Sequence, residues 1–250
     1  MNRIGITGQA GFIGTHLFNY LNLFKDKVQL IPFEDRFFQR KSDLESFVSK
    51  CDAVVHLAAL NRHNDPQAIY ETNIGLVKQL ISALENTGSR PHILFSSSTQ
   101  EERNNIFGNS KRDGRQLLSQ WAERSGAPFT GMLIPNVFGP FGNPYYNSVV
   151  ATFSHQLTHN EQPRVEVDAQ LKMIYIGDLV QVIWHLIKNR VSDGEYKITP
   201  TDEAKVTEIL TLLHSFKDQY LEKGIVPDLS DPFERNLFNT FVCYINHSTF

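Results

Sequence analysis

TGQAGFIG, residues 7–14, joins a short β-rich run at the N-terminus to an apolar helical pattern. In this strand–turn–helix context Gly8 permits a tight turn, Gly11 lets the backbone approach a diphosphate, and Gly14 lets the helix pack closely on the sheet. The first turn of the helix adds unpaired N–H groups and a favourable dipole for phosphate. Glycines also form ordinary turns, so it is the position directly after a strand that predicts dinucleotide binding.

The rest of the chain alternates β-rich and helical segments. Buried-strand patterns occur at 3–7, 28–33, 52–59, 92–98 and 127–134, and helical patterns lie between or beside them at 12–24, 65–86 and 106–125. This alternation predicts an α/β protein of the Rossmann type, with a doubly wound parallel sheet covered by helices on both faces.

After about residue 140 the pattern changes. It predicts a helix over 147–159, short strands at 163–167 and 171–176, and helices at 178–189 and 203–217. We therefore predict a dinucleotide-binding core over residues 1–140. Residues 141–250 are expected to form mainly a small C-terminal substrate-binding lobe, partly interleaved with the sheet.

Composition and charge exclude several classes of protein. The 250 residues are 41% hydrophobic and 20% charged, and a net charge of −3 gives no sign of a basic surface for nucleic acid. Cys51 and Cys243 are too few for a disulfide framework or a cysteine zinc cluster, and His63 has no second histidine at metal-ligand spacing from it. There is no signal-peptide layout and no apolar run of about 18 residues. We expect a soluble, cytoplasmic protein with no metal, no nucleic-acid partner and no membrane partner.

Several ordered motifs resemble those of one enzyme family. They are the glycine motif at 7–14, DAVVHLAA at 52–59, FSSS at 95–98, FGNSK at 107–111, PNVFGP at 135–140 and YIGD at 175–178. Together they resemble the extended short-chain dehydrogenase/reductases, the NAD-dependent epimerase/dehydratase family, over about residues 3–180. The resemblance implies an NAD(P)-dependent sugar-nucleotide oxidoreductase or epimerase that pairs as a homodimer through helices 65–86 and 106–125.

Two later stretches narrow the resemblance. Residues 135–157 and 231–250 are similar to the reductase half of the F-type capsular polysaccharide assembling proteins. This implies a 4-ketoreductase of a UDP-linked 2-acetamido-2,6-dideoxy sugar in bacterial surface polysaccharide biosynthesis. In that family a zinc-binding cupin domain follows the reductase, and this sequence stops near where the cupin would begin. It is either a stand-alone relative or part of a longer product.

The resemblance also assigns catalytic positions. Lys111 matches the lysine that holds the cofactor ribose and lowers the pKa of a catalytic tyrosine four residues earlier, and Ser98 matches the serine that hydrogen-bonds the substrate oxygen. The alternatives are a solvated helix lysine and a strand-end turn serine. The tyrosine itself is replaced by Phe107, which has no proton to give, and general acid catalysis contributes about 10²–10⁴-fold.

Three explanations of Phe107 stay open. The tyrosine was changed deliberately, another group such as Tyr145, Tyr146, His63 or water supplies the proton, or the protein binds its ligands without turnover. Two further departures favour natural divergence: Leu133 replaces an arginine before PNVFGP, and Arg115 replaces a glutamate after Lys111.

The resemblance also limits the reaction. Dehydratases of this family carry an Asp-Glu pair after the serine position, whereas Thr99 and Gln100 follow Ser98 here. Dehydration is therefore not expected, while 4-epimerisation stays open beside 4-keto reduction. A catalytically silent nucleotide- or sugar-binding module is the alternative from another class.

Cofactor contacts are expected from the glycine turn, the end of the second strand and the end of the third. The expected residues are Gly8, Gln9, Ala10, Gly11, Phe12, Ile13, Gly14, Arg36, Leu57, Ala58, Ala59 and Lys111. The stretch PFEDR (32–36) offers acids that suit the ribose hydroxyl of NAD and an arginine that suits the 2′-phosphate of NADP. A charged surface loop is the alternative. The capsular resemblance favours NADP slightly.

Substrate contacts are expected from Ser98, Asn136, Tyr146 and Asn147. An ordinary loop position is the alternative for Asn136, and helix N-capping is the alternative for Asn147. Asp178 opens a predicted helix, which favours an N-cap over a catalytic acid.

Overall fold

The computed structural model describes residues 1–103 and 105–246, which fall into two compact units. The first unit comprises residues 1–134 and 180–198, and the second comprises residues 135–179 and 199–250. The chain thus crosses between units three times. The last four residues of the predicted capsular-type stretch 231–250 lie outside the described residues.

The first unit contains a six-stranded parallel sheet in the order β2-β1-β3-β4-β5-β8. Its strands are β1 (Asn2–Thr7), β2 (Val28–Ile31), β3 (Ala53–His56), β4 (His92–Ser98), β5 (Phe129–Ile134) and β8 (Asp193–Lys197). β3, β4 and β5 consist almost wholly of buried residues, as expected for parallel strands covered on both faces. The predicted Rossmann-type fold is confirmed.

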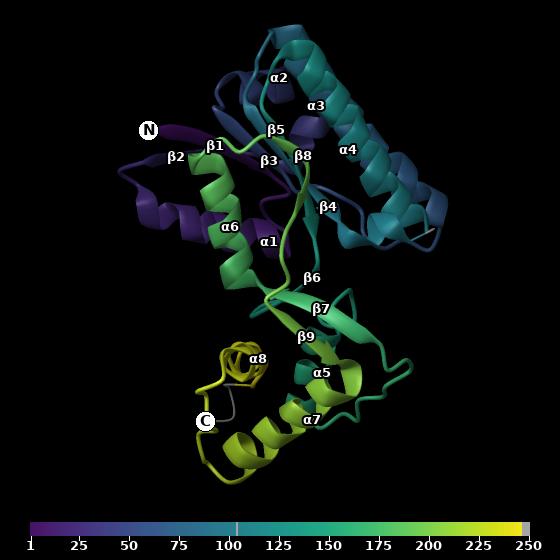
Figure 1. Ribbon diagram of the computed structural model, residues 1–250, viewed down its shortest axis with the longest axis vertical. Helices are drawn as coiled ribbons and strands as arrows, with labels where there is room; N and C mark the ends of the chain where they lie inside the picture. The colour runs from purple at the N-terminus through teal and green to yellow at the C-terminus, as the bar shows by residue number, and fades with distance from the viewer. Residues whose placement is uncertain (104, 247–250) are drawn as a thin grey trace. The chain divides into compact units, whose positions relative to one another are not determined.

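Helices cover both faces of this sheet (Figure 1). One face carries α2 (Lys41–Ser49), α3 (Pro66–Thr87) and α4 (Ile106–Ser125), whose apolar sides form one cluster with the sheet around Phe47, Leu80 and Trp121. The other face carries α1 (Phe12–Leu21) and α6 (Ile176–Lys188). Short helical turns complete the unit: η1 (Asn22–Phe24), η2 (Asp35–Gln39) and η3 (Thr99–Glu102).

The second unit has a three-stranded sheet in the order β6-β7-β9, with β6 parallel and β9 antiparallel to β7. Its elements are β6 (Asn136–Phe138), β7 (Gln170–Tyr175), β9 (Asp202–Lys205), α5 (Val149–Thr158), α7 (Val206–Phe216), the π-helical turn η4 (Lys217–Glu222) and α8 (Pro232–Val242). Its core lies among α5, α7, α8 and the sheet, around Phe138, Phe153, Ile209 and Phe241.

Two expectations for the later half are wrong. The predicted strand at 163–167 is irregular, since Pro163 has no N–H to donate and Val167 is 73% exposed. The predicted helix at 203–217 begins with strand β9 and becomes helical only at Val206. Strand β8, at the edge of the large sheet, was not expected because DGEYK has no apolar residue on a buried face.

Candidate active site

The glycine turn after β1 adopts a conformation that its glycines require. Gly8 has φ +69°, and a Cβ there would lie 2.7 Å from the backbone N of Ala58. A Cβ on Gly14 would lie 2.3 Å from the carbonyl oxygen of Gly8. Gly11 donates its N–H to that same oxygen at 3.0 Å and stands at the N-cap of α1 without a side-chain cap. The turn is therefore closed mainly by backbone, with one side-chain hydrogen bond from the Thr15 hydroxyl to the Gln9 carbonyl oxygen at 3.3 Å.

The predicted cofactor residues that follow β3 and begin α1 flank this turn. Leu57 and Ala58, after β3, donate their N–H groups to the carbonyl and hydroxyl oxygens of Thr7, at 3.2 and 3.3 Å. Ala59 follows them and is half-buried. On α1, Phe12 packs edge-on against His16 with ring centroids 5.2 Å apart, and Ile13 is half-buried. The ends of β1 and β3 thus lie side by side, as the strand order requires.

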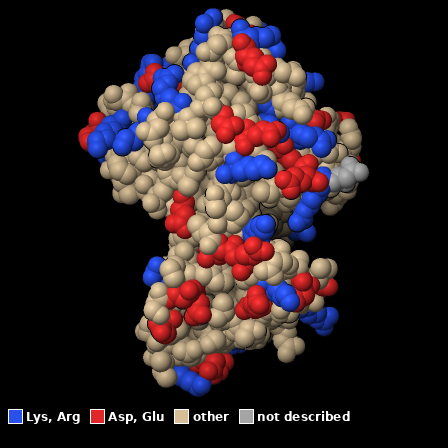
Figure 2. Space-filling view, viewed as in Figure 1, with Lys and Arg blue, Asp and Glu red and all other residues tan. Residues whose placement is uncertain are grey.

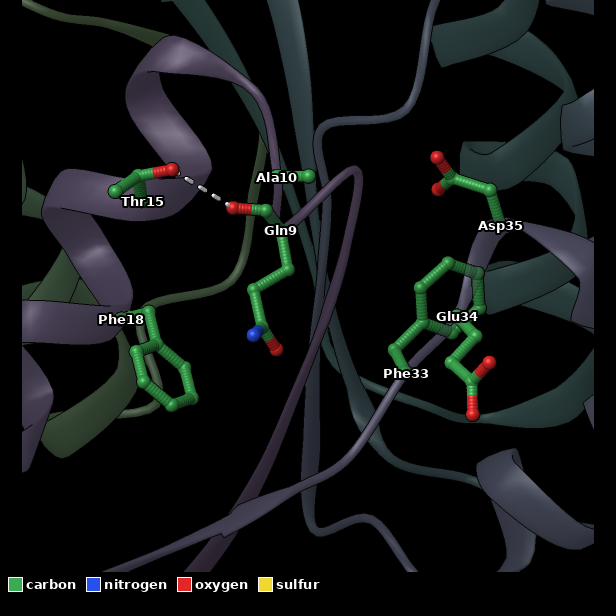
Figure 3. Close-up of a pocket in the computed structure, with 7 residues that line it drawn as sticks. All are labelled: Gln9, Ala10, Thr15, Phe18, Phe33, Glu34 and Asp35. Carbon is green, nitrogen blue, oxygen red and sulfur yellow. Dashed lines mark hydrogen bonds between the residues drawn. The ribbon is translucent and has the colours of Figure 1, made fainter. Parts of the chain in front are cut away.

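A hollow of about 340 Å³ lies between the glycine turn and the end of β2 (Figure 3). Its lining residues are Gln9, Ala10, Thr15, Phe18, Phe33, Glu34 and Asp35. Arg36 does not line it. Its guanidinium instead pairs with the Glu34 carboxylate through two contacts of 2.9 Å, and both side chains are more than half exposed. The hollow therefore presents carboxylates, with the nearby arginine already engaged.

The three predicted catalytic positions lie at the carboxyl end of β4 and the start of α4. Ser98 ends β4, and its Oγ accepts the N–H of Gln100 at 3.1 Å, which caps η3. Asn105 caps α4 by accepting the N–H of Gly108 at 2.7 Å. Phe107 is exposed in part at the first turn, and Lys111 follows one turn later on the same side of the helix.

Lys111 is buried, with only 5% of its surface exposed. Its Nζ donates to the Ser96 carbonyl oxygen at 2.9 Å. The ammonium lies 5.3 Å from the ring centroid of Phe95 and 5.7 Å from that of Phe107, within cation–π range. Burial lowers the pKa of Lys111 to about 8, partly opposed by the negative charge of Glu101. The alternative of a solvated helix lysine is wrong.

A buried ion pair that the sequence did not reveal lies beside this lysine. Arg115 donates to both carboxylate oxygens of Glu101, with Nη2 2.8 Å from Oε2, and the two side chains are 8% and 5% exposed. Arg115 also donates to the Gly194 carbonyl oxygen at 2.9 Å and contacts Glu195. Ser97 donates its hydroxyl to Glu101. The signal was the unusual arginine at 115; nothing in the sequence near Glu101 predicts its burial.

The predicted substrate residues Asn136, Tyr146 and Asn147 belong to the second unit and are all exposed. Asn136 donates from Nδ2 to the Lys172 carbonyl oxygen at 3.1 Å. Asn147 does not cap α5, because the cap is Ser148, whose Oγ accepts the N–H of Ala151 at 3.2 Å. The N-capping alternative for Asn147 is therefore wrong.

The expected N-cap at Asp178 is also wrong. Helix α6 begins at Ile176, so Asp178 stands inside its first turn, where burial raises the pKa of its carboxyl. His63 lies in the exposed loop before α3, where its Nδ1 accepts the N–H of Asp65 at 3.1 Å.

Membrane spans and metal clusters are both missing from the described part of the chain. Among residues 1–103 and 105–246, no helix combines the length and apolar character needed to cross a bilayer. Within the same residues, no three histidine, cysteine or acidic side chains gather as a metal site would require. On the face in Figure 2, lysine and arginine side chains are interspersed with acidic ones.

Comparison with known proteins places this geometry in a family. A family model described as the NAD dependent epimerase/dehydratase family matches residues 4–199. The chain belongs to this family. The membership expected from the ordered sequence motifs is thereby confirmed.

Individual relatives agree with this membership. The chain is 26% identical over 251 residues to UDP-2-acetamido-2,6-beta-L-arabino-hexul-4-ose reductase of Pseudomonas aeruginosa, an alignment that covers 99% of this chain and 66% of the relative. Among solved structures, the capsular polysaccharide assembling protein CapF from Staphylococcus aureus matches with a TM-score of 0.82 and 30% identity, over 98% of this chain and 66% of its own. The chain thus spans 66% of the length of each.

A third match shows the fold alone. RMD from Pseudomonas aeruginosa, solved with NADPH, has a TM-score of 0.80 at 20% identity and covers 98% of this chain and 99% of its own.

The family implies a nicotinamide dinucleotide, and the glycine turn fits one. A Cβ on Gly11 would have one neighbour within 4 Å among the described residues, the Gly8 oxygen at 3.2 Å, so the outer side of the turn is open. The first turn of α1 holds no acidic residue that would repel a diphosphate. Gly8–Gly14 would hold the diphosphate, the hollow at Glu34 the adenosine ribose, and Lys111 the nicotinamide ribose.

Proposed function

We propose that this chain reduces the 4-keto group of a UDP-linked 2-acetamido-2,6-dideoxy sugar, in bacterial surface polysaccharide biosynthesis. The observation that carries the proposal is the alignment with a reductase of such a sugar over 99% of the chain. The positions of Ser98 and Lys111 support it, because both stand at the carboxyl edge of the sheet that also carries the glycine turn.

Each predicted site residue has a proposed role in this reduction. A bound nicotinamide cofactor would supply the hydride. Ser98 Oγ would donate a hydrogen bond to the keto oxygen, while Lys111 would hold the cofactor ribose. Asn136, Tyr146 and Asn147 would contact the sugar nucleotide.

A second candidate is a binding module without turnover, which Phe107 favours because a phenyl ring cannot donate a proton. The test is oxidation of NADH or NADPH with a UDP-4-keto-6-deoxy-N-acetylhexosamine by the protein, by Phe107→Tyr and by Ser98→Ala. Turnover by the unmodified protein that falls in Ser98→Ala supports the reductase. Turnover by Phe107→Tyr alone supports the binding module. Reduction consumes one cofactor per sugar, whereas 4-epimerisation consumes none, so stoichiometry separates the two.

We also propose that NAD(H) is preferred over NADP(H), although the capsular resemblance leaned the other way. Carboxylates of Glu34 and Asp35 line the hollow near the end of β2, and they suit a ribose hydroxyl but repel a 2′-phosphate. Arg36 would have to leave Glu34 to bind that phosphate. Dissociation constants of NADH and NADPH test this. We expect NADH to bind at least about tenfold more tightly than NADPH. In Glu34→Gln the ratio of the two dissociation constants should be closer to one. Equal affinities would contradict it.

A further inference from the structure

The reduction needs a proton as well as a hydride, and Phe107 stands where the usual donor would be. The charged group in contact with the Phe107 ring is the Lys111 ammonium, 5.7 Å from the ring centroid. We propose that Lys111 Nζ is the proton donor of the reduction, in place of the phenol that Phe107 lacks. This inference rests on the proposed reductase function.

The geometry leaves protons on Lys111 for this task. An ammonium carries three protons, and within the described chain the one hydrogen-bond acceptor of Nζ is the Ser96 carbonyl oxygen at 2.9 Å. It also lies over the rings of Phe95 and Phe107. A keto oxygen held by Ser98, two residues after Ser96, would compete favourably with these weaker cation–π contacts.

The charges around Lys111 support an acid rather than a permanent cation. Burial lowers the pKa of its ammonium to about 8, close to where a general acid works best. Glu101 of η3 opposes this shift, and Arg115 on α4 neutralises Glu101 through their ion pair. His56 on β3 is fully buried, and burial with the nearby Lys111 charge lowers its pKa to about 3. His56 is therefore neutral at pH 7 and has no proton of suitable acidity to donate.

Two other candidate donors, Tyr145 and Ser98, are poorer. Tyr145 donates its hydroxyl to Glu161 at 2.5 Å, and this hydrogen bond raises the pKa of the phenol, which makes it a weaker acid. The Ser98 hydroxyl is an aliphatic alcohol and keeps its proton at neutral pH.

The proposed step balances. A bound reduced nicotinamide would supply the hydride: one of its C–H bonds would break, a C–H bond would form at the keto carbon, and the cofactor would be oxidised by two electrons. The carbonyl π electrons would pass to the sugar oxygen. That oxygen takes a proton from Lys111 Nζ, so an N–H bond breaks and an O–H bond forms. Lys111 becomes a neutral amine and regains its proton from solvent after the product leaves.

The test is the pH dependence of turnover between pH 6 and pH 10 at saturating cofactor and sugar. For the protein as it exists we expect the rate to fall about tenfold per pH unit above about pH 8, where the acid form is lost. Lys111→Arg keeps the charge but does not deprotonate, and we expect it to lose at least about 10²-fold in turnover while still binding cofactor. Phe107→Tyr restores a phenol as proton donor, so the pH above which its turnover falls should differ from that of the parent.

A second readout does not depend on activity. NMR of lysine side chains labelled at Cε, with Lys111→Met to assign the signal, should show Lys111 titrating near pH 8. A rate that stays constant through pH 9, or a Lys111→Arg variant with parental turnover, would overturn the proposal. If neither the protein nor Phe107→Tyr reduces the sugar, the proposed function fails. Activity of Phe107→Tyr alone would make the unmodified protein a binding module, so the proposed function and the acid role of Lys111 would both fail. Turnover by the unmodified protein that is independent of pH through pH 9 would overturn the role of Lys111 as acid and leave the reductase function standing.

Discussion

The buried charge of Lys111 should weaken the fold at neutral pH, and Lys111→Met should relieve this. The ordinary lysine pKa is 10.5 and the folded value is about 8. At 1.36 kcal/mol per pKa unit, holding the proton on Lys111 at pH 7 costs about 3 kcal/mol. Methionine has similar volume and no charge, but it leaves the Ser96 carbonyl oxygen without its donor, which costs about 1 kcal/mol. We expect Lys111→Met to be more stable by about 2 kcal/mol at pH 7.

The sign of the pH dependence follows from linkage. Between the folded pKa of about 8 and the ordinary value of 10.5, the unfolded chain binds more protons than the folded protein at this residue. The free energy of unfolding of the parent therefore rises with pH in this window, while the methionine of the Lys111→Met variant does not titrate. The difference between the two proteins should shift by about 2–3 kcal/mol from pH 7 to pH 10. All other titrating groups are shared and cancel.

The assay is urea unfolding at pH 7, 8, 9 and 10, followed by tryptophan fluorescence. Both tryptophans, Trp121 and Trp184, belong to the first unit, so the signal reports the unit that contains Lys111. Lys41→Met is the control, since the Lys41 side chain is 71% exposed and its charge loses little hydration on folding. If the stability difference between the parent and Lys111→Met stays constant to within about 0.5 kcal/mol, the claim that burial has depressed this pKa is refuted.

Three further changes test other parts of the structure. Gly14→Ala places a Cβ 2.3 Å from a backbone oxygen of the turn and should cost about 2 kcal/mol, seen in urea unfolding, and weaken NADH binding measured by calorimetry. Glu101→Gln removes the charge that pairs with buried Arg115 and should lower the free energy of unfolding by about 3 kcal/mol. A double-mutant cycle with Arg115→Met that gives no coupling free energy would contradict the pairing of these two residues. Tyr244→Phe removes a hydroxyl that donates to the Gly142 carbonyl oxygen at 2.5 Å, and should cost about 1 kcal/mol by circular dichroism with NADH affinity unchanged.

The sequence predicts the first unit well because its signals are local. The segments 52–59 and 92–98 contain the short apolar runs AVV and ILF, which are typical of strands covered on both faces. The glycine turn likewise has its context in the next few residues. Strand β8 carries no such signal. Its residues DGEYK alternate between exposed and half-buried, and it pairs only along the β5 edge. Its existence depends on partners more than 60 residues away in sequence, as in the pairing of Thr130 with Asp193.

In the candidate site, too, some residues can be predicted from local sequence and others depend on distant parts of the chain. Ser98 and Lys111 can be found from motif spacing, since a strand end and a helix start fix both. Glu101 cannot, because a lone glutamate after a strand is ordinarily exposed. Only the tertiary structure brings the Arg115 guanidinium to it and makes the carboxylate a buried counter-charge.

This buried pair bears on how Phe107 arose. Arg115 stands one turn after Lys111 on α4, where the family resemblance expects a glutamate, so the exchange puts a second cation beside a buried ammonium. Glu101 compensates: it binds Arg115 through both carboxylate oxygens and counteracts the depression of the Lys111 pKa. A single designed Tyr→Phe change would need no such compensation. The coordinated charges therefore support natural divergence at this site.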